Sequence, residues 1–369
     1  MKRVLYYWLF IFVFSVSACS KSDTPTENNS GNTNFTSTDA DTAFAAFNRT
    51  FYNPTAKLYY NNSNHDGTGA IWTQAIFWDI VMDAYLRTNK PEYKQMIDDI
   101  YLGGYMEYDG YNWNNKTEWF IYDDMMWWIG SLARAYQITG TRKYLDLSQS
   151  GFAHVWNNAY DTKAGGMFWA FDHGSKNSCI NFPTVIAAMR LYNITGDTVY
   201  LDRAKAVYWW AKNNLVDGSS GRVADYKTMD GHLGWDNYTY NQGTYIGAGV
   251  MLFKATGDQS YLEDAKLGAD FTKTSMCNSD GILPAEGDWN EQGVLKAIFA
   301  RYVMMLINDC NQTQYLPWIQ KNINTAWANR DKSRNITFRD YTVPCPKGLV
   351  QSYEASSIVG FMQICPTGN

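Results

Sequence analysis

Three stretches of this chain are variations of one pattern: ITGTRKYLDLSQSGFAHVW at residues 138–156, ITGDTVYLDRAKAVYWW at 194–210 and ATGDQSYLEDAKLGADF at 255–271. Each has a Thr-Gly pair, then Tyr-Leu, then a segment whose apolar residues recur at helical spacing. Glycine readily adopts the left-handed conformation that ends a helix, and the polar residue beside it can cap the next helix. The pattern therefore predicts two helices packed as a hairpin around each turn.

Two weaker copies, at residues 87–101 and 310–323, extend the repeat to both sides. The tyrosines that anchor the five copies are spaced 51, 56, 61 and 54 residues apart; they are Tyr93, Tyr144, Tyr200, Tyr261 and Tyr315. A near-constant period of this length, with helical patterning on both sides of the turn, indicates stacked helical hairpins.

Apolar periodicity marks twelve helical segments in all. They are residues 39–52, 69–88, 91–103, 118–138, 142–158, 178–194, 198–214, 241–255, 259–273, 291–308, 313–328 and 350–364. The helix before each turn is apolar nearly all round, and its successor is amphipathic. Six apolar helices inside six amphipathic ones predict an all-α fold, an (α/α)6 barrel, with an open helical solenoid as the alternative. No Pro-rich linker divides residues 39–369, so we expect one domain there.

Composition narrows the class of protein. Of the 369 residues, 46% are hydrophobic and 16% aromatic, which excludes a disordered chain. The net charge of −5 leaves no basic surface of the kind that nucleic-acid-binding proteins use, so we expect no nucleic-acid partner.

The N-terminus has the features of an export signal. Lys2 and Arg3 precede an apolar run at residues 4–14, which is too short to span a bilayer comfortably, and small residues then lead to Cys19. This arrangement resembles a bacterial lipobox. We expect a lipoprotein signal peptide at residues 1–18 and lipidation of Cys19, with an ordinary secretory signal as the alternative.

Residues 19–38 are rich in Ser, Thr, Asn and Gly, which is typical of a flexible tether. Ser20 follows the lipidated residue and favours the outer membrane, on its surface or its periplasmic face. We expect contact with the membrane through the lipid anchor alone, and a monomer.

Five cysteines remain after Cys19, and none forms a close pair typical of a metal or redox site. They are Cys179, Cys277, Cys310, Cys345 and Cys365. We expect mostly buried free thiols, although a Cys345–Cys365 disulfide is possible.

Six long connections lead into the inner helices and should meet at one mouth of the barrel. They are residues 53–68, 104–117, 159–177, 215–240, 274–290 and 329–349. Loops on a rigid scaffold often carry binding residues, and polar groups interleaved with aromatic rings suit a sugar. Asn, Asp and Gly are also ordinary turn residues. That alternative does not explain a series of tryptophans in or beside these connections: Trp72, Trp113, Trp169, Trp235 and Trp289.

Two adjacent acids, Asp123 and Asp124, interrupt the apolar segment EWFIYDDMMWWIGSLARAY at residues 118–136. Burying unpaired carboxylates there costs several kcal/mol. Paired carboxyls are the machinery of glycosidases, with ~5–5.5 Å between them in retaining enzymes and ~6.5–9.5 Å in inverting ones, and neighbours favour the shorter distance. Repulsion and an apolar wall would raise one pKa, leaving one carboxylate and one proton donor. Helix capping by one Asp or a divalent-metal site are alternatives.

YDDMMWW at residues 122–128, YNQG at 240–243 and QGVLKAIFARYV at 292–303, together with the repeat, resemble glycoside hydrolase family 76. Members are endo-acting α-1,6-mannanases. The resemblance implies that α-mannan is the substrate, that Asp123 is the nucleophile and that Asp124 is the acid/base. The implied mechanism is double displacement through a covalent mannosyl-enzyme, with no metal or other cofactor.

Other polar and aromatic residues near the openings of the inner helices are candidate sugar contacts: Trp72, Gln74, Trp128, Asp172, Asn181, Asp225, Tyr226, Asn241 and Gln242. Core packing is the alternative for Trp72. Lys296 and Arg301 lie on an inner helix, where we expect them to pair with buried acids.

Together with the N-terminal signal and the acid pair, the resemblance implies a lipid-anchored, retaining endo-α-1,6-mannanase of a cell envelope. Another (α/α)6 glycosidase, such as an unsaturated-uronyl hydrolase, is one alternative, but the loops are short of the Arg residues that a uronate needs. A non-catalytic glycan-binding lipoprotein is the other, and it leaves Asp123 and Asp124 unexplained.

Overall fold

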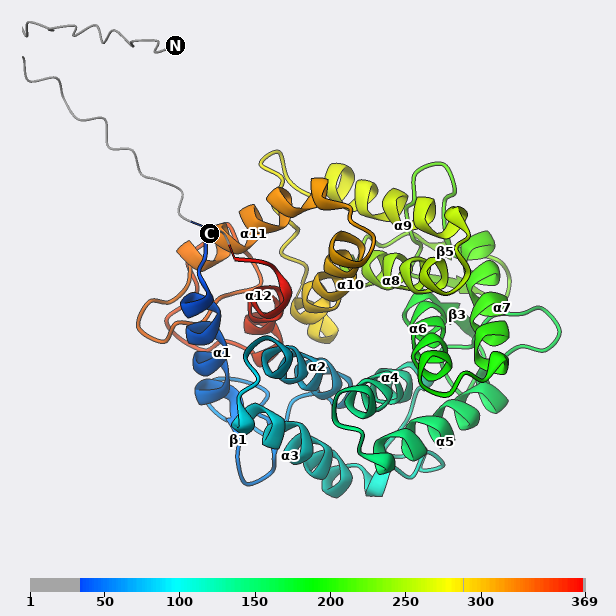
Figure 1. The fold of residues 1–369 in the computed structure, drawn as a ribbon, viewed down its shortest axis with the longest axis horizontal. Helices are drawn as coiled ribbons and strands as arrows, with labels where there is room; N and C mark the ends of the chain where they lie inside the picture. The colour runs from blue at the N-terminus through cyan, green and yellow to red at the C-terminus, as the bar shows by residue number, and fades with distance from the viewer. Residues whose placement is uncertain (1–33, 288, 368–369) are drawn as a thin grey trace, which may run out of the picture. The chain divides into compact units, whose positions relative to one another are not determined.

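Residues 34–287 and 289–367 are described by the computed structural model, and within them the chain forms the predicted (α/α)6 barrel (Figure 1). The inner ring consists of α2 (Ile71–Thr88), α4 (Tyr122–Thr139), α6 (Ser178–Thr195), α8 (Thr239–Thr256), α10 (Leu295–Asp309) and α12 (Ser352–Ile364). The outer ring consists of α1 (Ser37–Phe51), α3 (Pro91–Glu107), α5 (Arg142–Ala159), α7 (Thr198–Leu215), α9 (Gln259–Phe271) and α11 (Leu316–Ala328). The last inner helix, α12, packs against α2 and closes the ring, which excludes an open solenoid.

Burial separates the two rings as the apolar patterns predicted. Inner helix α6 is buried without interruption from Ser178 to Leu191. Outer helix α5 instead buries a single stripe of residues, Tyr144, Leu145, Ser148, Gly151, Phe152, Val155 and Ala159. The core therefore lies between the rings and inside the inner one.

The Thr-Gly turns have the expected geometry. Gly140, Gly196 and Gly257 follow the inner helices α4, α6 and α8 with φ of 69°, 70° and 74°, and each closes its helix with a backbone hydrogen bond. Asp197 and Asp258 then cap α7 and α9 by accepting hydrogen bonds from the backbone two residues ahead, each at 3.0 Å. This order of left-handed glycine and acidic cap explains why the repeat can be read from the sequence.

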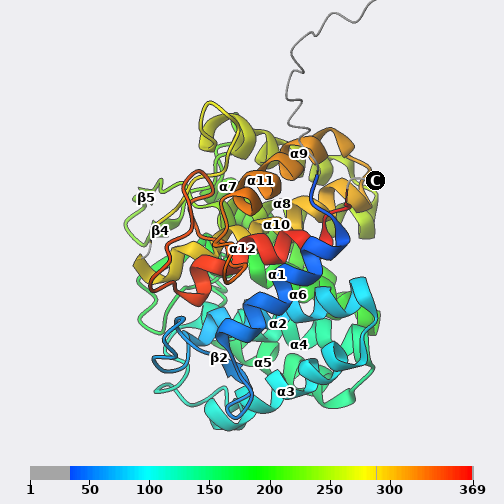
Figure 2. The same ribbon diagram turned by 90° about the vertical axis from the view of Figure 1, so that its left-hand side faces the viewer.

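Short strands lie within the long connections at one end of the barrel, opposite the C-terminus (Figure 2). One antiparallel pair joins β1 (Tyr52–Asn53) to β2 (Leu58–Tyr59). A three-stranded antiparallel sheet has the order β3 (Ser175–Asn177), β4 (Tyr226–Thr228) and β5 (Leu233–Gly234). The three-stranded sheet joins the connection before α6 to the connection before α8, and the β1–β2 pair lies within the connection before α2.

The structure shifts several predicted boundaries, among them the start of α10, which lies at Leu295 and not at residue 291. Helix α1 begins at Ser37, and Phe35 before it is buried, so residues 35–38 belong to the folded unit and not to the tether. Thr36 and Asp39 form a reciprocal capping box that fixes this start. Helix α4 begins at Tyr122, four residues later than predicted.

The predicted signal peptide at residues 1–18, Cys19 and the tether up to residue 33 lie outside the described residues. No helix in the described part of the chain is long and apolar enough to cross a membrane. The cysteines at 179, 277, 310, 345 and 365 are free thiols, so the possible Cys345–Cys365 bridge is not formed.

Candidate active site

A cavity of about 620 Å³ opens at the mouth of the barrel, between the first turns of the inner helices and the long connections. Six acidic residues line it: Glu107, Glu118, Asp123, Asp124, Asp225 and Glu291. Aromatic residues form much of the remaining wall: Trp72, Tyr108, Phe120, Trp127, Trp169, Tyr238, Tyr240 and Trp289. No lysine, arginine or histidine lies among the described residues of this wall.

Asp123 and Asp124 lie in the first turn of α4, and both side chains face this cavity. Only 8% of Asp123 and 3% of Asp124 is exposed. The backbone N–H of Asp124 donates to Asp123 Oδ1 at 3.1 Å. A helix N-terminus carries partial positive charge, which favours acidic groups at this position. The late start of α4 thus brings both carboxyls to one site although they are neighbours in sequence.

The environment separates the two acids in pKa. Burial raises the pKa of Asp123 to about 6, and hydrogen bonds from Cys179 and Trp169 oppose that rise. Burial raises the pKa of Asp124 much further, and the negative charges of Asp123 and Glu291 add to the effect. Asp123 therefore loses its proton first, and near neutral pH the pair holds one carboxylate and one carboxylic acid.

A chain of buried polar groups leads through hydrogen bonds to Asp123. The thiol of Cys179, in the first turn of α6, donates a hydrogen bond to Asp123, and burial keeps that thiol protonated by raising its pKa. The hydroxyl of Tyr240 is within hydrogen-bonding reach of the Cys179 sulfur and lies 3.3 Å from Asp225 Oδ1. Asp225 also accepts from Asn241 Nδ2 at 2.8 Å. This chain fixes Asp123 without pairing it with a cation.

A connection before α10 brings a further acid to the cavity. Asn290 and Glu291 both adopt the left-handed backbone conformation, with φ of 48° and 55°. Trp72 Nε1 donates to Glu291 Oε2 at 3.1 Å, which holds the carboxylate in the wall of the cavity. Trp289, just before this kink, is 79% exposed and also lines the cavity.

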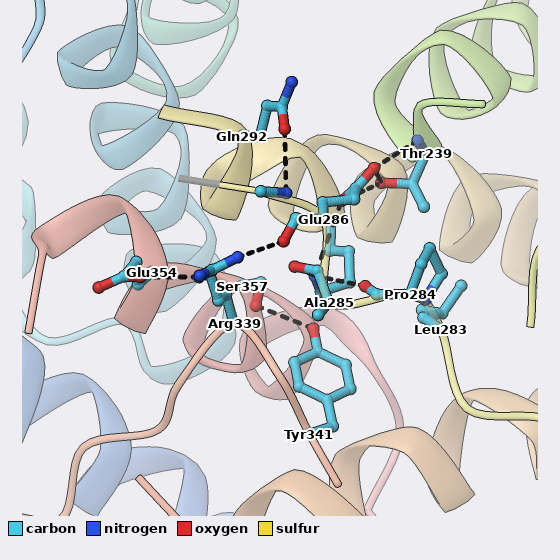
Figure 3. A network of polar contacts seen from close by, with 12 residues as sticks. Thr239, Leu283, Pro284, Ala285, Glu286, Gln292, Arg339, Tyr341, Glu354 and Ser357 are labelled. Atoms are coloured by element: carbon cyan, nitrogen blue, oxygen red, sulfur yellow. Dashed lines mark hydrogen bonds and ion pairs between the residues drawn. The ribbon is translucent and has the colours of Figure 1, made fainter. Parts of the chain in front are cut away.

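A buried polar network anchors this connection at its base (Figure 3). The Glu286 carboxylate accepts from the backbone N–H of Thr239 at 2.7 Å and from the Thr239 hydroxyl at 2.9 Å. Lys296 Nζ lies 3.6 Å from Glu286 Oε2 and donates to two backbone carbonyls of the connection. Arg339 joins the Glu286 carbonyl to the Glu354 carboxylate. The network ties the start of α8, α10 and α12 to the segment that carries Trp289 and Glu291.

Of the candidate sugar contacts, Trp72 and Asp225 line the cavity. Several others are buried behind it and hold backbone. Gln74 accepts from the Tyr59 N–H at 2.8 Å and donates to its carbonyl at 2.9 Å. Asn181 makes the same two-sided contact with Met167, at 2.8 and 3.0 Å. These amides clamp the connections to the inner helices.

The remaining candidates also lie away from the cavity wall. Trp128 donates to the Ile71 carbonyl at 2.8 Å, and Gln242 lies between the carbonyl of Gly221 and the N–H of Val223, at 3.0 Å from each. Asn241 is buried and holds Asp225, Tyr226 is in β4, and Asp172 is exposed and accepts from the Gly174 N–H. Gln74, Trp128, Asn181 and Gln242 are thus bonded to backbone groups, and their predicted contact with a sugar stays a prediction.

The tryptophan series divides in the same way. Trp72, Trp169 and Trp289 line the cavity. Trp113 is buried in an aromatic cluster, and Trp235 packs against the Arg222 guanidinium. As predicted, Lys296 pairs with Glu286, and Arg301 pairs with Asp79 and Asp83.

Sequence patterns did not single out Cys179, Tyr240 or Glu291 as site residues. The sequence predicts Cys179 only as a buried thiol, and it places Glu291 at the start of the helix predicted for residues 291–308, whereas α10 begins at Leu295. Cys179 is the second residue of α6, as Asp123 is of α4. This shared position near the start of an inner helix is the one sequence signal that could have marked Cys179 as a site residue. Among the described residues, no group of three or more His, Cys, Asp or Glu has a geometry that could hold a metal ion.

The sequence model of glycosyl hydrolase family 76 matches residues 36–363. The chain belongs to this family. The mannan endo-1,6-alpha-mannosidase DCW1 of Candida glabrata is 27% identical over 188 residues, which cover 47% of this chain and 38% of that protein. The DCW1 protein of Eremothecium gossypii is 24% identical over 298 residues, covering 72% of this chain and 64% of the other. The chain spans between 38% and 66% of the length of the curated relatives it matches.

Solved structures of the family have the same architecture. The GH76A alpha-1,6-mannanase from Salegentibacter sp. HEL1_6 is 27% identical and superimposes with a TM-score of 0.82, covering 89% of this chain and 98% of that one. An inactive variant of that enzyme, with two consecutive aspartates replaced by alanine, was solved in complex with alpha-1,6-mannotetrose; it gives a TM-score of 0.80 at 26% identity, covering 89% of this chain and 98% of the other.

Proposed function

We propose that this protein is a retaining, endo-acting α-1,6-mannanase. The observation that carries the proposal is the buried Asp123–Asp124 pair, whose members face one cavity and differ in pKa. A related mannanase that binds alpha-1,6-mannotetrose as an inactive variant has two consecutive aspartates replaced, which supports the assignment of the chemistry to such a pair.

In the proposed first step, the Asp123 carboxylate attacks the anomeric carbon of the mannosyl unit. The bond from that carbon to the glycosidic oxygen breaks, and Asp124 gives its proton to the departing oxygen. In the second step, Asp124 takes a proton from water while the water oxygen attacks the same carbon and releases Asp123. Two inversions leave the α configuration unchanged, and both acids return to their starting protonation states.

The charge of the cavity favours a neutral sugar. Six acidic residues and no basic residue line its described wall, so the carboxylate of a uronic acid would meet only like charge. This argues against an unsaturated-uronyl hydrolase. Hydroxyl groups of mannose can instead donate to the carboxylates, and the aromatic wall offers surfaces for the C–H faces of the rings.

Two exposed aromatic residues support action within a polymer. Phe120 is 57% exposed and Trp289 is 79% exposed, and they reach the cavity from different connections. An open rim with aromatic surfaces can contact sugar units on either side of the one at Asp123. A pocket closed at one end would favour release of single sugars from a chain terminus.

Incubation with linear, debranched α-1,6-mannan tests the proposal. We expect a ladder of short oligosaccharides by chromatography, and NMR during the first turnover should detect the α-anomer before mutarotation. A first product in the β form would contradict the retaining mechanism but not the substrate. If mannan in an affinity gel slows the migration of the protein and the protein releases no oligosaccharide, it is a glycan-binding protein.

We also propose that the protein is a monomeric lipoprotein of the outer membrane, anchored at Cys19. The basic start, the short apolar run and the small residues before Cys19 support this proposal. Incorporation of radiolabelled palmitate should occur in the wild type and fail in Cys19→Ala. Labelling of neither form, with cleavage at another site, would favour an ordinary secretory signal.

A further inference from the structure

A second cavity, of about 630 Å³, lies at the end of the barrel opposite the mouth. Its wall comes from the C-terminal halves of the inner helices, whereas the mouth is built from their first turns. Four arginines line it, Arg87, Arg134, Arg190 and Arg301, together with two acids, Asp83 and Asp309. Asp309 is paired with Lys254. We call it the rear cavity.

Two of these arginines are matched by two buried acids. Arg301 donates to both oxygens of Asp83, at 2.9 and 2.6 Å, and its Nε lies 3.4 Å from Asp79. Arg134 pairs with the same two acids, at 3.2 Å from Asp79 Oδ1. Arg87 is also matched, because it pairs with Asp41. Arg87, Arg134 and Arg301 are therefore each paired with at least one carboxylate.

Arg190, on α6, has no such partner. Only 5% of it is exposed, and its single hydrogen bond runs from Nη1 to the Gly130 carbonyl at 2.7 Å. No carboxylate in residues 34–287 or 289–367 lies within ion-pair distance of its guanidinium. The buried cluster thus holds three guanidinium groups, Arg134, Arg190 and Arg301, against the two carboxylates Asp79 and Asp83, which leaves one positive charge.

A guanidinium has five N–H donors, and burying one without a matching carboxylate is costly. The C-terminal ends of the inner helices contribute partial negative charge at this end of the barrel and offset part of the cost. They do not supply acceptors to the free N–H groups of Arg190. An anion with several acceptor oxygens fits both the charge and the donors.

We propose that the rear cavity binds a small oxyanion through the guanidinium of Arg190. The shared chemistry is that of phosphate, sulfate or a carboxylate: negative charge and two or more oxygens in the plane of the donors. Apolar side chains also line the rear cavity, among them Met251, Met304 and Met305, so it suits a short carbon skeleton on an organic anion as well. The site is independent of the sugar chemistry at the mouth.

Thermal unfolding with sodium phosphate as the probe, at constant ionic strength set with sodium chloride, tests the proposal. A ligand that binds only the folded state raises Tm with its concentration, and about 100-fold over Kd the rise should be roughly 5 °C for a domain of this size. We expect a rise for the wild type that grows with the logarithm of the phosphate concentration above Kd, and none for Arg190→Gln. Arg142→Gln, which alters an exposed arginine of α5, is the matched control and should keep the rise.

Repeating the titration with sulfate and with acetate separates inorganic from carboxylate ligands. No rise for the wild type at constant ionic strength, or a rise that is equal in Arg190→Gln, would overturn the proposal. Should Arg190→Gln fail to fold, wild-type crystals soaked in sodium selenate give a second test. An anomalous selenium peak within hydrogen-bonding distance of Arg190 supports the site, and its absence from the rear cavity contradicts it.

Discussion

The two ends of the barrel have cavities of nearly the same size and opposite chemistry. The charged residues that line the mouth, where the inner helices begin, are all acids in the described part of the chain. The rear cavity, where those helices end, is lined by four arginines and by the two acids Asp83 and Asp309. Both signs agree with the helix dipole, which favours anions at N-termini and cations at C-termini. The ends differ in pairing: at the rear Asp79 and Asp83 meet arginines, whereas at the mouth Asp123 and Asp124 meet each other. A buried acid that has no cationic partner is a candidate for a catalytic role, whereas a buried acid paired with arginine is expected to stabilise the fold.

Removing either acid at the mouth should have the largest effect on activity. Asp124→Asn removes the proton donor, and we expect kcat on α-1,6-mannan to fall by about 10²–10⁴-fold. Asp123→Asn removes the group that forms the covalent bond, so its loss should be at least as large. Both variants should keep the wild-type circular dichroism spectrum, because an amide replaces a carboxyl of the same size.

Azide can distinguish the two roles. It attacks the mannosyl-enzyme without needing a base, so sodium azide should restore turnover of an aryl α-mannoside by Asp124→Ala and yield the α-azide. Asp123→Ala should give the β-azide, since azide then enters directly in place of the nucleophile. The reverse pattern would exchange the roles of Asp123 and Asp124.

Removing a paired acid at the rear should instead destabilise the fold. Asp83→Asn removes one of the two carboxylates that Arg134 and Arg301 share and leaves them Asp79, and breaking such a buried pair costs about 3–5 kcal/mol. Urea denaturation should detect this loss, while KM for mannan stays at the wild-type value. Asp146→Asn breaks an exposed pair with Arg142 and should cost less than about 1 kcal/mol. Equal losses for the two variants would contradict the contrast between the ends.

The buried acids at the two ends of the barrel should also change the stability of the fold in opposite directions as the pH rises. Asp123 has its pKa raised from 3.8 to about 6 by burial, so its contribution to stability is present below pH 3.8 and is lost as the pH rises through about 6. The difference corresponds to about 3 kcal/mol. At pH 7.5 Asp123→Asn should therefore have a higher Tm than the wild type, and the gap should close toward pH 4.

Asp79 behaves oppositely, because the positive charges of Arg301 and Arg134 outweigh its burial and lower its pKa. Its stabilising effect is present above pH 3.8 and is lost as the pH falls through the lower folded value. Asp79→Asn should thus be less stable than the wild type at pH 7.5, with the gap closing only in acid. If Asp123→Asn and Asp79→Asn both raised Tm, or both lowered it, at pH 7.5, the two acids would not differ in the way proposed here.

Glu291 tests how the mouth sets the pKa of the proton donor. Its negative charge adds to the raised pKa of Asp124, so Glu291→Gln should lower that pKa. The alkaline limb of the kcat profile should move to lower pH, by about one pH unit or less, while the acidic limb near pH 6 stays in place. An unchanged alkaline limb would mean that Asp124 does not feel Glu291 during turnover.

The barrel could be predicted from sequence because its determinants are local. Gly140, Gly196 and Gly257 end their helices where the Thr-Gly pairs stand, and apolar spacing distinguishes inner from outer helices. The acid pair was also visible, because two carboxyls in an apolar segment break the pattern. Gln74 and Asn181 break it too, yet their partners are backbone groups 14 and 15 residues away that no pattern reveals. Glu291 reaches the cavity through a left-handed kink without glycine, which sequence spacing does not predict.

The smallest expected effect concerns the rim of the mouth. Trp289 is largely exposed and packs little of its ring against the protein, so its removal should not change the fold. Loss of one aromatic contact with a sugar is worth about 1 kcal/mol, which is about a fivefold change in binding. Trp289→Ala should therefore raise KM for long α-1,6-mannan about fivefold and leave kcat unchanged. Trp209→Ala, on outer helix α7 and away from the cavity, is the control. If Trp289→Ala lowered kcat at unchanged KM, the residue would act through the Glu291 connection and not by contact with the polymer.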